Sequence, residues 1–173
     1  SPSQYGEYES RVQAIIQNIK ENGDEALFSY TKQFDKADIN ASNVKVTDEE
    51  FEEAYKAVDP ALLDVIRKAL VNIESYHELQ KQNSWFKSTP QGTMLGQKVT
   101  PLEKVGVYVP GGKAVYPSSV LMNIMPAKVA GVDKIIMTTP CNAEGKVNPA
   151  VLVAAKEAGA DEVYKAGGAQ AIA

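Results

Sequence analysis

The sequence has little of several things on which protein function often depends. Its 173 residues include one cysteine, Cys141, one histidine, His77, and one tryptophan. A single cysteine cannot form a disulfide within the chain. One cysteine with one histidine also cannot supply the four ligands of a usual protein zinc site. Any metal bound here therefore needs ligands from elsewhere.

Long apolar runs and runs of basic residues are also missing. No stretch approaches the roughly 20 apolar residues that span a bilayer, and the beginning Ser1-Pro2-Ser3-Gln4 has no signal-peptide character. The formal net charge is -4, without a lysine or arginine run, which argues against a nucleic-acid partner. We therefore expect a cytoplasmic protein with no membrane and no nucleic acid among its partners.

The composition itself, 44% hydrophobic and 23% charged, is that of a globular protein. A chain of this length can bury about 70% of its unfolded surface, enough for one or two compact domains. The pattern of apolar residues changes near residue 100. We expect residues 1–100 to form a mainly helical segment with a short strand pair near its end, and residues 101–173 to form a truncated Rossmann-like α/β domain.

Several local signals mark helix ends in the first segment. Asn22-Gly23 predicts a stop, because glycine accepts a left-handed conformation at little cost. Thr47 with Glu50 fits a capping box, and Asp59-Pro60 predicts the cap and first residue of a long helix that fades near Asn83. The helical period is lost over residues 85–100, which favours a strand pair or an irregular crossing segment.

After Pro101, short β-rich runs alternate with helical stretches. Residues 104–109, 134–139 and 162–165 predict strands, and residues 118–130 and 148–158 predict helices between them. This order predicts an incomplete Rossmann-like β-α-β-α-β unit with a parallel sheet. Pro126 predicts a kink or a restart in the first helix, since its ring clashes with the carbonyl four residues earlier. Residues 169–173 look like the first turn of another helix, so we expect a domain truncated at that point.

Two glycine pairs, Gly111-Gly112 and Gly167-Gly168, follow the first and third predicted strands. The ligand crevice of an open parallel sheet lies beyond the carboxyl ends of its strands. Glycine there lets backbone approach a ligand closely. Neither pair matches G-x-G-x-x-G, so the usual dinucleotide fingerprint is absent. Two interpretations stay open for each pair, a tight strand-to-helix turn and a ligand contact.

Several motifs agree with one known family. In order and spacing, the chain resembles histidinol dehydrogenase in VGVYVPGGKA, VLMNIMPAKVAGV and VYKAGGAQAIA, and upstream in GDEALFSYTKQFD and NIESYHELQ. The resemblance covers essentially the whole chain. It implies that the chain is the N-terminal portion of a longer enzyme.

The resemblance implies an enzyme that oxidises L-histidinol to L-histidine through the aldehyde, with two NAD and a bound zinc, as a homodimer. Tyr108 and Gln170 match family positions that contact NAD. A tyrosine offers a ring face and a hydroxyl, and a glutamine amide offers a donor and an acceptor. Taken without the family, Tyr108 is read as a packed strand-end aromatic and Gln170 as a polar residue of a first helical turn. The acid-base residues and zinc ligands of the family are expected outside this chain.

Other residues that could carry chemistry have plainer interpretations. His77 shares a helix face with Ile66, Leu70 and Ile73, which predicts a packed or boundary histidine. Cys141 has no visible partner base, which favours an unreactive thiol. Met122 and Met125 lie among apolar neighbours and are predicted to pack in the core. We expect no turnover from the chain alone. The alternative function is an inactive folded module for subunit assembly or weak nucleotide binding.

Overall fold

The computed structural model describes residues 5–111 and 116–173. Its helices are α1 (Tyr5–Asp35), α2 (Asp48–Ala57), α3 (Pro60–Glu78), α4 (Pro117–Ala130), α5 (Pro149–Ala158) and α6 (Gly168–Ile172). Its strands are β1 (Trp85–Ser88), β2 (Met94–Gln97), β3 (Lys104–Tyr108), β4 (Lys134–Thr139) and β5 (Glu162–Lys165). Ser1-Pro2-Ser3-Gln4 and Gly112 lie outside the described residues.

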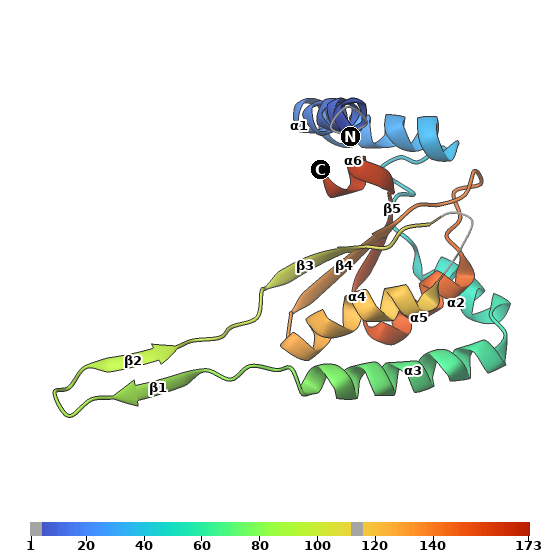
Figure 1. Ribbon diagram of the computed structural model, residues 1–173. Coiled ribbons are helices and arrows are strands. Elements are labelled where there is room, and N and C mark those ends of the chain that lie inside the picture. Colours follow the sequence, from blue (N-terminus) through green and yellow to red (C-terminus); the bar gives the residue numbers. More distant parts are fainter. Residues whose placement is uncertain (1–4, 112–115) are drawn as a thin grey trace.

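The second half of the chain has the predicted parallel β-α-β-α-β arrangement. Strands β3, β4 and β5 pair in parallel in that order, with β4 in the centre. Helices α4 and α5 lie on one face of this sheet, and α3 packs against α4 on the far side (Figure 1). Side chains that point toward the helices, such as Ile135, Met137 and Val163, are fully buried. Those that alternate with them are exposed or half-buried, so only one face of the sheet is well covered.

The predicted helix ends are confirmed. Gly23 has non-helical angles, φ 54° and ψ -131°, and divides α1 into two helical parts. The Thr47 side chain accepts a hydrogen bond from the Glu50 amide while the Glu50 carboxylate accepts one from the Thr47 amide. Asp59 caps α3 through the amide of Ala61. One detail differs from the predictions: helix α3 ends at Glu78, before Asn83. Helix α4 continues through Pro126, so of the two predicted alternatives, a kink or a restart, the restart does not occur.

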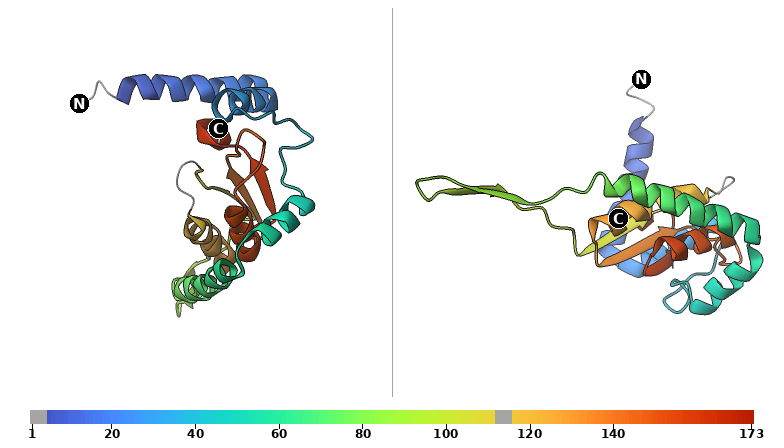
Figure 2. Two further views of the ribbon diagram at one scale, coloured as in Figure 1. Left: turned by 90° about the vertical axis from the view of Figure 1, so that its right-hand side faces the viewer. Right: turned by 90° about the horizontal axis from the view of Figure 1, so that it is seen from below.

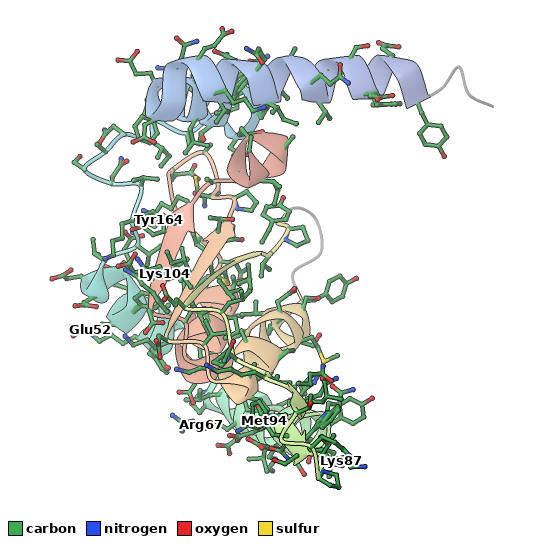
Figure 3. The ribbon with its side chains drawn as sticks, turned by 90° about the vertical axis from the view of Figure 1, so that its left-hand side faces the viewer. Glu52, Arg67, Lys87, Met94, Lys104 and Tyr164 are labelled. Atoms are coloured by element: carbon green, nitrogen blue, oxygen red, sulfur yellow. The ribbon has the colours of Figure 1, made fainter. Side chains whose placement is uncertain are left out.

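A two-stranded antiparallel hairpin, β1 with β2, projects away from the body of the protein (Figures 1 and 2). It confirms the predicted strand pair. All eight residues of its strands are exposed. Lys87 and Met94 lie on this hairpin, away from the sheet residues Lys104 and Tyr164 (Figure 3). The ring of Phe86 lies over Gly96 on the opposite strand.

Helix α1 lies across the carboxyl end of the parallel sheet, where it contacts α6 (Figures 1 and 2). Ala26 and Thr31 in its second part are buried at 4% and 1% exposure. The free edge of β5 is covered by residues 44–46, whose backbone bonds to Val163 and Lys165. The buried apolar residues of both halves of the chain join in one cluster, which holds the carboxyl edge of the sheet in place.

Candidate functional site

The carboxyl edge of the parallel sheet carries both residues that the sequence singles out. Tyr108 ends β3, opposite Thr138 of β4, and Gln170 lies in α6 directly after β5. Strand β4 lies between β3 and β5. Tyr108 and Gln170 therefore approach each other from the two sides of this central strand, beyond its carboxyl end. The crevice expected in an open parallel sheet lies at this edge.

Tyr108 and Gln170 meet at Gly168. The amide of Gly168 donates a hydrogen bond to the hydroxyl oxygen of Tyr108 at 3.2 Å. A Cβ added to Gly168 would lie 2.6 Å from Oε1 of Gln170, so the glutamine amide lies directly against the glycine. The structure therefore brings the two predicted residues together. With its oxygen accepting from Gly168, the Tyr108 hydroxyl still has its own proton to donate.

Exposure differs between these two side chains. Tyr108 is half-buried on the less covered face of the sheet, whereas Gln170 is only 4% exposed. The second part of α1 packs against α6 and covers it. A ligand at this edge would therefore reach Tyr108 directly and Gln170 only at a narrow exposed margin of its amide.

Gly111 and Gly167, one glycine of each pair, also allow close packing. Both lie against Pro140, the residue after β4. A Cβ at Gly111 would lie 2.5 Å from Cγ of Pro140, and one at Gly167 would lie 2.7 Å from its Cβ. Gly168 has φ +65°, a left-handed angle that favours glycine. The interpretation as a tight strand-to-helix turn is thus confirmed for Gly167 and Gly168, between β5 and α6, and the ligand interpretation rests on Tyr108 and Gln170.

A cavity of about 530 Å³ lies beside Pro140 and Gly111. Its polar lining includes Asp35 from the end of α1, Thr139 from β4, and Cys141. Burial raises the pKa of the Cys141 thiol, and the negative charge of Asp35 raises it further. Burial also raises the pKa of the Asp35 carboxyl. A thiol with a raised pKa is a poor nucleophile, which agrees with the unreactive interpretation of Cys141.

A buried ion pair beside this edge was missed by sequence reasoning. Lys165, the last residue of β5, is 5% exposed, and its ammonium lies 2.9 Å from the Glu50 carboxylate of α2. The sequence shows Glu50 as a capping residue, and it gives no sign that the same carboxylate also reaches a lysine 115 residues away. One signal was present. Lys165 lies two residues after the buried Val163, which places it on the same, covered face of the strand.

His77 lies far from the sheet edge, in α3. Its Nδ1 is 2.7 Å from Oε1 of Gln80, and its ring meets that of Tyr76 edge-on at 5.3 Å. The Nε2 atom is buried without a hydrogen-bond partner among the described residues. The predicted boundary position is confirmed.

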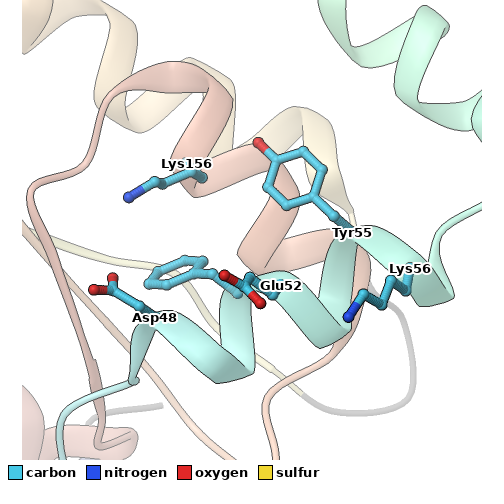
Figure 4. A pocket seen from close by; sticks show the side chains of 6 residues that line it. Asp48, Glu52, Tyr55, Lys56 and Lys156 are labelled. Carbon is cyan, nitrogen blue, oxygen red and sulfur yellow. The ribbon is translucent and has the colours of Figure 1, made fainter.

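A second hollow lies between α2 and α5 (Figure 4). It has a volume of about 700 Å³, and the Lys156 ammonium lies 5.2 Å from the centre of the Phe51 ring. Behind it, Tyr55 donates to Glu157, which also receives two hydrogen bonds from Arg67. Burial and the bond to Glu157 raise the pKa of Tyr55 to about 12. These contacts join helices, and none of them involves the strand ends.

Within residues 5–111 and 116–173, no three histidine, cysteine, aspartate or glutamate side chains are grouped so as to hold a metal ion. In the same part of the chain, no helix combines the length and apolar character needed to cross a membrane.

Comparison with known proteins gives one consistent result. The family model described as histidinol dehydrogenase matches residues 1–173. A histidinol dehydrogenase of Bacillus subtilis (strain 168) is 56% identical over 167 residues, which are 96% of this chain and 39% of that protein. The protein of that name from Heliobacterium mobile is 53% identical over 163 residues, 94% of this chain and 38% of its own length.

A solved structure agrees with these sequence matches. The crystal structure of histidinol dehydrogenase from Elizabethkingia anophelis superposes with a TM-score of 0.87 at 38% identity, covering 95% of this chain and 37% of that one. The chain thus spans less than two fifths of the length of these relatives.

Proposed function

The chain belongs to the histidinol dehydrogenase family, and we propose that it supplies part of the NAD-binding crevice of an enzyme that oxidises L-histidinol to L-histidine through the aldehyde. Residues 101–173 provide this part of the crevice, and residues 1–100 form the helical segment beside it. The observation that carries the proposal is the meeting of Tyr108 and Gln170 at Gly168, across the central strand.

The chemistry of these groups suits a dinucleotide. NAD, when bound, accepts the hydride that leaves the alcohol and then the aldehyde. Tyr108 would donate its hydroxyl proton to a ribose or phosphate oxygen and offer its ring for stacking. The Gln170 amide, held against Gly168, would contact the same ligand at its exposed margin. Gly168 positions both side chains, because a larger residue would displace Gln170.

Zinc, which the family resemblance also implies, receives no ligands from the described residues in this proposal. His77 and Cys141 lie on different elements, and the raised pKa of the Cys141 thiol opposes the thiolate form that binds a metal. We assign no catalytic step to this chain. The residues that move protons and hold zinc would come from the rest of a longer protein, acting as a homodimer in the cytoplasm.

The experiment is an activity and binding assay on the purified 173-residue chain. We expect no reduction of NAD in the presence of L-histidinol, and weak binding of NAD that requires Tyr108. Turnover by a preparation free of longer protein would overturn the first expectation. The absence of any NAD binding would overturn the second.

One observation favours the alternative function, a module for subunit assembly. The hairpin and the C-terminal end of α3 expose large apolar side chains, including Trp85, Phe86 and Leu79. Titration calorimetry with NAD separates the two functions, because a module used only for assembly gives no heat of NAD binding.

A further inference from the structure

The cavity beside Pro140 and Gly111 contains a carboxyl group without a partner. The cavity is lined by the residues that follow β3 and β4, by those that lead into α5, and by Asp35 at the end of α1. Asp35 is half-buried. Burial raises the pKa of its carboxyl, and within the described residues no hydrogen bond or cation acts against that rise. The carboxylate has therefore lost water on folding without gaining a donor in exchange.

The hydroxyl of Thr139 faces the same cavity. Thr139 is the last residue of β4, is 2% exposed, and lines the cavity. The equally buried Thr31 donates its hydroxyl proton to the Leu27 carbonyl. The Thr139 hydroxyl has no such bond in the described part of the chain, and its oxygen is not sealed from solvent. Because buried polar groups are normally paired, this hydroxyl is available to a ligand in the cavity.

The start of α5, which also lines the cavity, offers no donor to an anion. The Asn148 side chain accepts a hydrogen bond from the Ala150 amide, and the Asn148 carbonyl accepts from the amides of Val151 and Leu152. Pro149 has no amide proton. The amides that would bind a phosphate at a helix start are thus already used within the helix.

The cations near the cavity already have carboxylate partners. Lys146 is the one cationic side chain among the described residues that line the cavity, and its ammonium lies 3.3 Å from the Glu53 carboxylate. The ammonium of Lys165, whose charge acts on Cys141, lies 2.9 Å from the Glu50 carboxylate. The unpaired charge of the cavity is therefore negative. Such a cavity disfavours a phosphate and favours a ligand that donates hydrogen bonds.

A ribose with two free neighbouring hydroxyls supplies such donors. One carboxylate can accept from both hydroxyls, and a threonine hydroxyl can bond either of them. In open parallel sheets that bind dinucleotides, an acidic residue often holds the adenosine ribose in this way. We propose that Asp35 accepts hydrogen bonds from the 2′- and 3′-hydroxyls of the adenosine ribose of NAD, beside Thr139, and thereby selects NAD against NADP.

The position of the cavity agrees with this assignment. Gly111, in its lining, follows Tyr108 by three residues, and Pro140 lies against both Gly111 and Gly167. The cavity and the contact of Tyr108 with Gly168 are therefore neighbouring parts of one sheet edge. The inference rests on the proposed function, because it assigns a further part of the same ligand to this edge.

NADP differs from NAD in the group that Asp35 would meet. Its 2′-oxygen carries a phosphate, which removes one donor and brings negative charge to an unpaired carboxylate. Discrimination thus has an attractive and a repulsive part. We expect NAD to bind the 173-residue chain about tenfold more tightly than NADP, the effect of one hydrogen bond to a charged group.

The first test is calorimetric titration of NAD and NADP into the parent chain and two variants. Asp35→Asn should weaken NAD binding, strengthen NADP binding and bring the two affinities together. It removes no partner from Asp35, so the circular dichroism should stay that of the parent. The control is Asp38→Asn, which removes a negative charge from an exposed side chain outside this cavity, paired with Lys32. An unchanged preference in Asp35→Asn, or equal loss of preference in both variants, would overturn the proposal.

The second test measures the pKa of the Asp35 carboxyl by NMR, with and without saturating NAD. Hydrogen bonds from the ribose favour the charged carboxylate, so NAD should lower this pKa. A pKa that stays or rises, while NAD shifts the amide of Gly168, would overturn the role of Asp35 and leave the proposed function standing. A lowered pKa without shifts at Gly168 would support the cavity and contradict the site at Tyr108 and Gln170. No response at either place would overturn both.

Discussion

Tyr108 and Gly168 are joined by a hydrogen bond of 3.2 Å although 60 residues and a whole strand, β4, separate them. The amide that donates this bond stands at the start of α6, and the hydroxyl that accepts it stands at the end of β3. The bond therefore ties the end of β3 to the start of α6. This contact links the stability of the edge to the proposed NAD site.

Replacing Tyr108 with phenylalanine tests this link. Tyr108→Phe removes the acceptor of the Gly168 amide, and we expect a loss of about 1 kcal/mol in the free energy of unfolding, together with weaker NAD binding. Urea denaturation and NAD titration measure the two effects. Tyr164→Phe is the control, because it also removes one hydroxyl hydrogen bond, to Glu162, but away from the proposed site. Equal loss of NAD binding in both variants would contradict the assignment.

The packing of glycine on Pro140 gives a second prediction. Gly111→Ala and Gly167→Ala should each destabilise the protein by about 1 to 3 kcal/mol, since the added Cβ overlaps the proline. Gly106→Ala is the control, because a Cβ there meets nothing within 4 Å. Thermal unfolding of the three variants measures the difference.

The same geometry predicts a selective rescue. The Cβ of Gly111→Ala would lie 2.5 Å from Cγ of Pro140, whereas that of Gly167→Ala would lie 2.7 Å from its Cβ, 3.2 Å from Cγ and 3.3 Å from Cα. Pro140→Ala removes Cγ and keeps Cβ and Cα. It should therefore restore stability to Gly111→Ala and fail to restore it to Gly167→Ala. Rescue of both variants, or of neither, would show that the contact differs from the one described.

The ion pair of Lys165 with Glu50 predicts an asymmetry between its two partners. Glu50→Gln leaves a lysine charge whose side chain is 6% exposed, whereas Lys165→Met leaves a carboxylate that is 21% exposed and can be hydrated. We expect Glu50→Gln to cost about 3 kcal/mol of unfolding free energy and Lys165→Met clearly less. The double variant should recover most of the loss. Glutamine still fits the capping box, so the cap does not account for the difference.

The control for this pair lies on the same helix. Glu53 faces Lys146 at 3.3 Å, with both side chains more than 60% exposed. Glu53→Gln should change the free energy of unfolding by less than about 1 kcal/mol. If Glu50→Gln lowers the free energy of unfolding as little as Glu53→Gln does, the ion pair between Lys165 and Glu50 is not effectively buried.

Glu162 predicts a dependence of stability on pH. Hydrogen bonds from Lys134 and Tyr164 lower the pKa of its carboxyl from 4.5 to about 2. A carboxyl with a lowered pKa stabilises the folded state above its ordinary pKa, and that contribution is lost as the pH falls through the folded value. Stability should thus decline between about pH 4.5 and about pH 2, and less steeply in Glu162→Gln. A carboxyl titration by NMR with a midpoint near 4.5 would refute this.

Much of the fold could be predicted because its signals are local. The capping box at Thr47, the cap at Asp59 and the alternation of strands and helices depend on residues close in sequence, and all were confirmed. The closeness of Tyr108 and Gln170 followed from the rule that parallel strands end at one edge. Their contact with NAD remains a prediction.

The remaining features depend on which helix faces pack against other elements, and a local sequence pattern does not show this. Met122 and Met125 were both predicted to pack in the core. The prediction is confirmed for Met125, which is 6% exposed, and wrong for Met122, which is 55% exposed. The helix α4 is apolar on several sides, so periodicity did not show which side α3 and α5 would cover.

The most direct test of the proposed site is a titration of the isotope-labelled 173-residue chain with NAD, followed by the amide signals in NMR. We predict the largest shifts at Gly168, with further shifts at Tyr108 and at the backbone and side-chain amides of Gln170. The absence of shifts at millimolar NAD, or shifts gathered in the hollow between α2 and α5, would contradict the proposed site.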